Sequence, residues 1–487
     1  MLKESNNFIK NKKVLLMGLG TLGGGLATAK WLLKHGAILT ITDLRDSSKL
    51  KNTLDNLKKI KKPIKYVLGE HKKEDFLQND IIVVNPGVSF RNKFLILAKK
   101  HGKQIENELT LFYKICPART LGVTGTRGKT TTVHWLRHFL QAKHPKATLA
   151  GNFTKHPLLE MVDKYKGNAP IVLELPSFLL EFLSFVKISP DVAVITNIYK
   201  DHLNRYRGIK DYAETKANIF RYQNKDQTLI LNENNNWTKF FKEKKPKSKI
   251  LFFSLTPFSD NQNGIYIDKN LSIYVKKGKN EKLFYDAQIF IERWGRHNLE
   301  NLLASTLAAS SFGVPLPKII KKIESLPQVP FRQEVVFKNR KLEIINDTTA
   351  TSPDASIAAV QRFRRKNAKL ILITGGTDAD LDYKGWAVEI KKTLPEKDVV
   401  FIEGSATDKM LKELNFKNPR VYKMLDVCFF QAMKSIGKGD KRNIILFSPG
   451  AKSFEKFKHE FDRGEQFNAL VKKVKSALGE SKARWVK

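Results

Sequence analysis

The sequence predicts an α/β protein of three domains built on mostly parallel sheets. Continuous apolar runs alternate with segments of helical periodicity, as expected for strands that helices cover on both faces. The length of 487 residues suits about three separate cores. Interruptions that contain proline, at 112–119 and 325–332, place the boundaries and give domains at 1–111, 112–328 and 329–487.

The N-terminal domain opens with a βαβ pattern. A strand is predicted at 12–20, a helix at 21–36 that ends at Gly36, and a second strand at 37–43. Such a unit implies two parallel strands joined by a right-handed crossover, as in a Rossmann-like domain.

The turn after the first strand carries a GxGxxG pattern. Its glycines are Gly18, Gly20 and Gly23, and Asp43 ends the next strand. Glycines at this spacing let the backbone approach a diphosphate at the N-terminus of the helix, and the acid would bind a ribose. The pattern indicates a bound nucleotide diphosphate, while NAD and a tight turn without a ligand remain open.

A phosphate-binding loop is predicted in "LGVTGTRGKTTT" at 121–132. A strand precedes it at 119–125, and the helix after it begins with threonines suited to capping. Val123 stands where the Walker A pattern has its first glycine, but the phosphate-facing part of the loop is intact. Lys129 would contact the β and γ phosphates of a nucleotide, and the hydroxyl of Thr130 would bind Mg²⁺.

The rest of the chain continues the alternation of strands and helices. Further strands are predicted at 80–87, 169–176, 191–198, 227–232, 369–376, 398–404 and 443–450. The segment 233–290 is rich in Asn, Lys and Gly and predicts loops and short antiparallel strands. The last domain therefore again follows an α/β pattern and is predicted to be Rossmann-like.

Composition narrows the function. The formal net charge is +39, from 87 Lys and Arg against 48 Asp and Glu. These basic residues are spread along the chain without a nucleic-acid-binding motif, so we expect no nucleic-acid partner. A P-loop ATPase that binds nucleic acid is kept as a distant alternative.

Location and redox state can also be predicted. No segment approaches the ~20 apolar residues of a membrane span, and the N-terminus lacks the apolar core of a signal peptide, so we expect a cytoplasmic protein without membrane insertion. Cys116 and Cys428 show no CxxC spacing, which argues against a disulfide framework or a cysteine zinc site.

Six motifs, the phosphate loop among them, resemble the Mur ligase family in order along the central and C-terminal predicted domains. They are "GVTGTRGKT" at 122–130, "ELPSF" at 174–178, "TNIYKDHLNRY" at 196–206, "AETKANIF" at 213–220, "GRHNLEN" at 295–301 and "NDTTATSPDA" at 346–355. The ending at 448–467 and the N-terminal domain are similar to the D-glutamate-adding members. An NAD oxidoreductase would leave the "DH" and "GRHN" segments unexplained.

The resemblance implies an ATP-dependent ligase of peptidoglycan synthesis. Its substrates would be ATP, UDP-N-acetylmuramoyl-L-alanine and an amino acid, with D-glutamate expected. The substrate carboxylate would attack the γ-phosphate of ATP, and the amine would then attack the resulting acyl phosphate. We expect a monomer with a UDP-binding N-terminal domain, an ATP-binding central domain and a C-terminal domain for the amino acid.

The resemblance also implies roles for individual residues. Family residues that bind ATP match Gly125, Thr126, Gly128, Lys129, Thr130, Thr131, Asn298, Arg332 and Asp347. Residues that bind the UDP-sugar match Gly18, Gly20, Thr21, Gly23, Asp43, Arg45, Gly87 and Asn152, which makes the ligand of the GxGxxG turn a uridine diphosphate.

The catalytic set implied by the resemblance is Lys129, Glu174, His202 and Lys216. Thr130 and Glu174 resemble ligands of one Mg²⁺, and His202 resembles a ligand of a second. The lysine that matches Lys216 is carboxylated in the family and supports the second metal. A carbamate forms only from a neutral amine, so the pKa of this lysine would have to be depressed.

The last domain departs from the family pattern at two positions. Thr349 and Ala379 stand where the family commonly has lysines. Ser453 and Phe454 retain the other part of the amino-acid site, and Lys384, Lys452 or Arg463 are candidates to replace the lost cations. The added amino acid is therefore left open between D-glutamate, L-glutamate and another amino acid.

Overall fold

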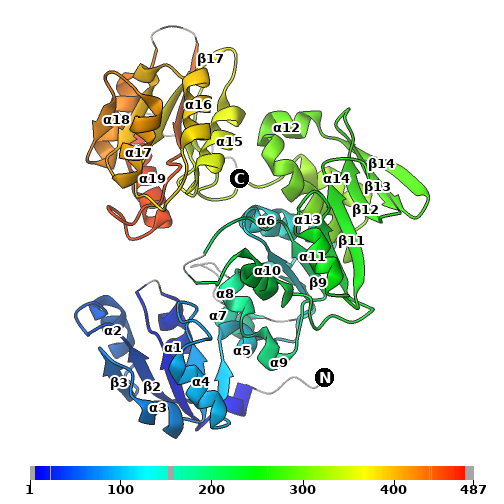
Figure 1. Cartoon of the computed structure of the whole chain (residues 1–487), viewed down its shortest axis with the longest axis vertical. Coiled ribbons are helices and arrows are strands. Elements are labelled where there is room, and N and C mark those ends of the chain that lie inside the picture. Colours follow the sequence, from blue (N-terminus) through cyan, green and yellow to red (C-terminus); the bar gives the residue numbers. More distant parts are fainter. Residues whose placement is uncertain are drawn as a thin grey trace. The chain divides into compact units, whose positions relative to one another are not determined.

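The computed structural model describes residues 6–477 except 22, 152–157, 166, 203, 204, 260, 438 and 440. It forms two compact units, which are described separately below (Figure 1). The first comprises Met1–Ala287 and Leu299–Ser325, and the second comprises Gln288–Asn298 and Leu326–Lys487. Helices and mostly parallel sheets confirm the predicted α/β class. The domain boundaries themselves stay predictions.

The N-terminal part of the first unit is a five-stranded parallel sheet of order β3-β2-β1-β4-β5. Its strands are β1 (Lys13–Met17), β2 (Ile38–Asp43), β3 (Ile64–Leu68), β4 (Ile81–Val84) and β5 (Gln104–Glu106). The helices are η1 (Asn6–Ile9), α1 (Gly24–Lys34), α2 (Lys51–Lys58), α3 (Lys73–Gln78), α4 (Lys93–Lys100) and α5 (Glu108–Ile115). The strand order reverses between β1 and β4, which is where such sheets bind their ligands.

The central part of the first unit contains a nine-stranded sheet of order β14-β13-β12-β11-β10-β9-β6-β8-β7. Its strands are β6 (Thr120–Thr124), β7 (Thr148–Gly151), β8 (Ile171–Glu174), β9 (Val192–Ile195), β10 (Thr228–Asn232), β11 (Lys249–Ser254), β12 (Gly264–Ile267), β13 (Ser272–Lys277) and β14 (Asn280–Asp286). Antiparallel pairing joins β12, β13 and β14, as predicted, whereas β11 pairs in parallel with β10 and β12.

Helices cover this central sheet. They are α6 (Lys129–Leu140), α7 (Leu158–Lys164), α8 (Ser177–Leu180), α9 (Leu183–Val186), α10 (Ile209–Ala217), α11 (Thr238–Glu243), α13 (Leu299–Ser311) and α14 (Leu316–Ile323). α6 and α13 pack side by side (Figure 1). One apolar cluster continues from Leu32 of the N-terminal part through Phe112 of α5 to Leu173 of β8, so both parts of the unit share a core.

The second unit contains a six-stranded sheet of order β15-β16-β20-β17-β18-β19, in which only the β15–β16 pair is antiparallel. Its strands are β15 (Glu334–Lys338), β16 (Leu342–Asn346), β17 (Ala368–Thr374), β18 (Val399–Ile402), β19 (Arg420–Tyr422) and β20 (Arg442–Phe447). The helices are α12 (Gln288–Trp294), η2 (Arg296–Asn298), α15 (Pro353–Phe363), α16 (Lys384–Thr393), η3 (Glu396–Asp398), α17 (Ser405–Leu414), α18 (Leu425–Lys434) and α19 (Glu460–Ala477).

Strand register in the central sheet positions the candidate site. β6 lies between β8 and β9, with Val123 opposite Glu174 and Thr124 opposite Ile195. Because these strands are parallel, the phosphate loop, Glu174 and the segment after β9 leave the sheet at one edge. In the part of the chain that the structure describes, no helix combines the length and apolar character that crossing a membrane requires.

Candidate nucleotide-binding and catalytic site

The loop between β6 and α6 can be formed only with glycine at two positions. Gly125 and Gly128 have φ angles of +146° and +82°. A Cβ atom at Gly125 would lie 1.9 Å from Thr196 Oγ1, and one at Gly128 would lie 2.3 Å from Asn301 Oδ1. Gly128 is also the N-cap of α6 and no side chain caps the helix there, so the prediction that threonines cap it is wrong.

The segment after β9 holds this loop in place. The backbone N–H of Thr126 donates to Asn197 O and that of Arg127 donates to Asn197 Oδ1, both at 2.9 Å. The hydroxyl of Thr196 in turn donates to Arg127 O at 2.7 Å. Sequence analysis missed these supports, although Thr196 and Asn197 directly follow a strand that borders β6. The loop is thus fixed before any ligand arrives.

Two lysines contact the backbone of the phosphate loop. Lys129 Nζ donates to Gly125 O at 3.0 Å and to Thr126 O at 2.9 Å. Lys216 Nζ, from α10, donates to the same Gly125 O at 2.9 Å and to Thr124 Oγ1 at 3.3 Å. Lys216 is only 1% exposed. Burial, followed by the charge of Lys129, holds the pKa of Lys216 well below its usual range, which favours the neutral amine.

Glu174 provides a carboxylate at the same edge of the sheet. It ends β8 and is 4% exposed. Its Oε2 atom is buried and has no hydrogen-bond partner among the described residues. A buried carboxylate oxygen without a partner is costly, so a cation or donor supplied by a ligand fits this position. The chemistry and burial of Glu174 therefore fit a candidate Mg²⁺ ligand.

His202 lies in the loop that follows β9. It adopts a left-handed conformation with φ of 53°, its side chain is half exposed, and its Nε2 lies 3.6 Å from Asp201 Oδ2. Its ring centroid is 6.1 Å from that of Tyr212, which packs beneath Lys216. The described ranges contain no group of three or more His, Cys, Asp or Glu side chains able to hold a metal. The metal-binding roles stay predictions.

In the N-terminal sheet, Asp43 organises the glycine-rich turn. Its Oδ2 accepts from the backbone N–H groups of Leu19 and Gly20, both at 2.9 Å. Its Oδ1 accepts from Arg45 N at 2.9 Å, and Asp43 is only 3% exposed. The carboxylate therefore shapes the turn, and its predicted role in binding the UDP-sugar stays a prediction. The Arg45 side chain is half exposed and can reach a ligand.

The loop after β4 lies beside this turn. A Cβ atom at Gly18 would lie 3.1 Å from Asn85 Cβ, and Asn85 Oδ1 accepts from Gly87 N at 3.1 Å. Gly87 and Thr21 are exposed. Asn85 was not predicted from the sequence. Asn152, the remaining predicted residue of this set, lies outside the described residues.

The second unit gathers the other three predicted ATP residues around Arg362, a partly buried arginine. Asn298 Nδ2 donates to Trp294 O at 2.7 Å, and the guanidinium of Arg362 lies 5.4 Å from the centroid of the Trp294 ring. Arg362 also donates to Gln333 Oε1 at 3.0 Å, and its charge and that of Arg332 act on Asp347. Arg362 was missed because nothing in its helix sequence indicates these long-range contacts.

Asp347 is held at the end of β16. Its Oδ1 accepts from Gln333 N at 3.0 Å and its Oδ2 accepts from the hydroxyl of Ser448 at 2.8 Å. Burial raises the pKa of Asp347 from 3.8 to about 7, against the opposing effect of these hydrogen bonds. The group therefore titrates near neutrality.

Replacing Asp347 with Asn is expected to flatten the pH dependence of stability. Between pH 3.8 and about pH 7 the folded state keeps a proton that the unfolded state has lost, so wild-type stability falls as pH rises and is level above about 7. The variant should gain roughly 2–4 kcal/mol relative to the wild type across that window. Thermal midpoints measured from about pH 4.5 to about pH 7.5 test this. The exposed Asp408 changed to Asn is the control, and parallel wild-type and Asp347→Asn profiles would contradict it.

Ser453 and Phe454, which are predicted to bind the amino-acid substrate, lie beside a small hollow in the second unit. Ser453 is 3% exposed, and its Oγ atom has no hydrogen-bond partner within the described part of the chain, while Phe454 is 65% exposed. The hollow is lined by Gly376, Thr377, Ile402, Glu403, Ser453, Glu455, Lys456, Phe457 and Arg463. The unpaired hydroxyl of Ser453 suits a polar ligand.

Arg463, a candidate to replace a lost lysine, lines this hollow and is hydrogen-bonded to the protein backbone. It is 0% exposed, and its guanidinium donates to Thr348 O at 2.7 Å, Lys452 O at 3.1 Å and Ala451 O at 3.2 Å. The hydroxyl of Thr349, at the other departure from the family, donates to Phe331 O at 2.8 Å. Both groups therefore hold the backbone of this unit.

Solved structures share this fold. The chain aligns over 96% of its length with 97% of the MurF ligase from Thermotoga maritima in complex with ADP, at a TM-score of 0.55 and 17% identity. It aligns over 95% of its length with all of a pseudomurein peptide ligase type C from Methanothermus fervidus, at a TM-score of 0.52 and 19% identity. At these identities the likeness shows the fold alone, a mixed α/β architecture of three domains with mostly parallel sheets.

The sequence comparisons are more specific. Residues 12–107 match the family model for the MurD-like N-terminal domain of Mur ligases, and residues 123–309 match the Mur ligase middle domain. The chain belongs to the Mur ligase family. Its relatives include the UDP-N-acetylmuramoylalanine–D-glutamate ligases of Roseiflexus sp., 35% identical over 95% of this chain and 99% of the relative, and of Borreliella afzelii, 34% identical over 95% and 98%.

Proposed function

We propose that the protein is an ATP-dependent ligase that joins D-glutamate to UDP-N-acetylmuramoyl-L-alanine. The observation that carries the proposal is the arrangement at the edge of the central sheet. There the phosphate loop meets Lys129, the buried amine of Lys216 and the unpaired oxygen of Glu174. The identity of the substrates is taken from the names of the relatives described above. The proposed enzyme acts as a cytoplasmic monomer that needs no nucleic acid.

The reaction requires activation of a carboxylate. The terminal carboxylate of the UDP-linked substrate attacks the γ-phosphorus of ATP, which forms an acyl phosphate and releases ADP. The amine of the amino acid then attacks the acyl carbon, and the tetrahedral intermediate expels inorganic phosphate as the nitrogen loses its proton. Both steps develop charge on phosphoryl or acyl oxygens, so fixed cations and N–H groups at those oxygens lower the barrier.

The phosphate loop would bind and orient ATP. The loop leads into the N-terminus of α6, where the backbone amides of Lys129 to Thr131 lie in the first helical turn and the helix dipole favours an anion. Lys129 would exchange its loop carbonyls for the β and γ phosphates. Mg²⁺, held by Thr130, Glu174, His202 and the carboxylated Lys216 in two sites, would offset phosphate charge.

The N-terminal sheet and the second unit would supply the remaining ligand contacts. Arg45 and the exposed turns at Thr21 and Gly87 suit the UDP-sugar, and Asp43 would act by shaping the turn. Asn298, Arg332 and Asp347 would contact the adenine nucleotide, and Ser453 and Phe454 the amino acid. Because Thr349 and Ala379 remove two usual cations, L-glutamate or another amino acid is the alternative acceptor.

Phosphate release by the purified protein tests the proposal. Reactions contain ATP, Mg²⁺ and UDP-N-acetylmuramoyl-L-alanine, with D-glutamate, L-glutamate or other amino acids added singly and product masses checked. We expect turnover with D-glutamate alone. Turnover with only another amino acid would change the assigned specificity but keep the mechanism, whereas turnover that requires DNA or RNA would replace the ligase with the ATPase alternative.

A further inference from the structure

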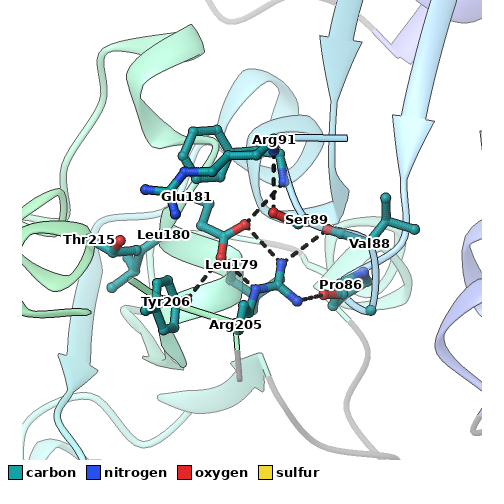
Figure 2. Close-up of polar contacts among 12 residues, drawn as sticks. Pro86, Val88, Ser89, Arg91, Leu179, Leu180, Glu181, Arg205, Tyr206 and Thr215 are labelled. Carbon is teal, nitrogen blue, oxygen red and sulfur yellow. Dashed lines mark hydrogen bonds and ion pairs between the residues drawn. The ribbon is translucent and has the colours of Figure 1, made fainter. Parts of the chain in front are cut away.

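A polar junction joins the N-terminal sheet to the central sheet within the first unit (Figure 2). We define the junction as Arg91, Glu181, Arg205, Tyr206 and Asp211. Its N-terminal partner is the loop 85–91, which contains the exposed Gly87 assigned above to the UDP-sugar. Nothing in the sequence analysis or in the proposed catalytic set uses these side chains.

Arg205 fixes the substrate loop through its backbone. Its Nη1 donates to Pro86 O at 2.9 Å and its Nη2 donates to Val88 O at 3.0 Å (Figure 2). These two carbonyls flank Gly87, so one guanidinium sets the conformation of the loop on both sides of that residue. The planar fork of an arginine can make both contacts at once.

Glu181 holds Arg205 in the orientation that these contacts need. Its Oε1 accepts from Arg205 Nε at 2.6 Å and its Oε2 accepts from Arg205 Nη2 at 2.8 Å. The hydroxyl of Tyr206 donates to Glu181 Oε1 at 2.9 Å, and Phe90 N donates to Oε2 at 3.4 Å. The Glu181 side chain is 1% exposed and that of Arg205 is 17% exposed. Because the Glu181 carboxylate is buried and the Arg205 side chain is mostly shielded, this pair fixes geometry in a way that an exposed ion pair does not.

A second ion pair ties the same loop to α10. Arg91 Nη1 and Nη2 donate to the two carboxylate oxygens of Asp211, at 2.9 Å and 2.7 Å. Asp211 also accepts from Arg207 N at 3.0 Å, which closes the first turn of the helix. The loop is therefore attached to two separate segments of the central part of the unit.

Each junction residue of the central part belongs to a segment that carries a candidate catalytic residue. Glu181 caps α8, which follows Glu174. Arg205 N donates to His202 O at 2.9 Å, so Arg205 is joined directly to His202. Asp211 lies on α10 together with Lys216. One substrate loop is thus linked to all three of these segments.

We propose that Arg205 is a positioning residue that sets the UDP-sugar loop against the catalytic segments of the central sheet. The inference rests on the proposed function, since the UDP-sugar role of the loop comes from it. In this role Arg205 would act without touching phosphate or the reacting carboxylate. It would hold the carbonyls of Pro86 and Val88 and join them to His202 through the hydrogen bond from Arg205 N.

Changing Arg205 to Lys tests this role. Lysine keeps the charge opposite Glu181 but has no planar fork, so it cannot hold both loop carbonyls. We expect the Kd for UDP-N-acetylmuramoyl-L-alanine, measured by calorimetry without ATP, and the KM for this substrate to rise about tenfold. The KM for ATP should change by less than about twofold, because the phosphate loop is held by other residues.

Two further variants control for folding and for general domain attachment. Asp163 on α7 contacts Trp31, Lys34 and His35 around α1, which joins the same two sheets away from the substrate loop. Asp163→Asn should leave the Kd for the UDP-substrate within about twofold of the wild type. If Arg205→Lys fails to fold, Arg91→Lys at the more exposed pair is measured instead, with an expected rise in Kd of about threefold.

The outcomes separate this inference from the proposed function. A wild-type protein that binds no UDP-N-acetylmuramoyl-L-alanine would end the proposed function and the inference together. Wild-type binding with an unchanged Kd in the folded Arg205→Lys variant, or in Arg91→Lys where that is the variant measured, would overturn the inference alone. An equal loss of affinity in Asp163→Asn would assign the effect to general attachment of the two sheets and would also overturn it.

Discussion

Changing Lys129 to Ala is expected to lower kcat for phosphate release at least about 10³-fold. The negative charge on the oxygens of the transferring phosphoryl group would lose its nearest fixed cation. The fold should persist. Lys129 is the first residue of α6, alanine suits that position, and the side chain bonds only to carbonyls of its own loop in the contacts described above. Phosphate release and the thermal midpoint are measured on the same preparation.

Lys143 offers a matched control for this variant. It lies just beyond the other end of α6, and its Nζ also donates to a backbone carbonyl, that of Gly313, at 3.0 Å. Lys143→Ala removes a comparable contact away from the loop and should keep turnover within about twofold. Undiminished turnover of Lys129→Ala would remove the phosphate-loop assignment, and a loss shared by both variants would point to damaged folding.

Much of the fold was readable from apolar periodicity. The runs at β1, β6 and β8 are continuous because both faces of their sheets are covered, and the structure confirms them as parallel strands. Strand direction was harder to predict. Lys249–Ser254 forms β11, which pairs in parallel with β10 although the region was predicted to contain short antiparallel strands. An apolar strand has the same sequence pattern in parallel and in antiparallel pairing. The direction of pairing depends on the neighbouring strand, which the pattern does not identify.

Single residues of the site were predictable where backbone geometry demands one residue type. Gly125 and Gly128 could be placed because no Cβ atom fits there. Long-range partners could not be placed in this way. Arg205 lies in a motif that drew attention to its histidine, yet its carbonyl partners come from a loop far away in the chain. The ligand role of Asp43 stays a prediction, and the sequence did not reveal that its Oδ2 holds the glycine-rich turn while its Oδ1 accepts from Arg45 N.

Changing Lys216 to Met is expected to separate activity from stability. The amine is 1% exposed and its pKa is depressed chiefly by burial, so an unbranched apolar side chain of similar length removes a desolvation cost. The thermal midpoint should stay level or rise, while kcat should fall at least about 10²-fold. The exposed Lys210 on the same helix, changed to Met, should alter neither quantity.

The activity loss is expected because the proposed carbamate needs this nitrogen. A neutral amine adds to CO₂ and releases one proton, which turns the only nitrogen of the side chain into part of an anion beside the phosphate loop. A ¹³C signal from labelled bicarbonate should therefore appear in the wild type and be absent from Lys216→Met. Retained turnover in the variant would show that the buried amine is only structural, and a signal of equal size in both proteins would place the carbamate on another residue. A lost signal together with lost turnover and an unlowered thermal midpoint would show that this nitrogen serves the reaction and not the stability of the fold.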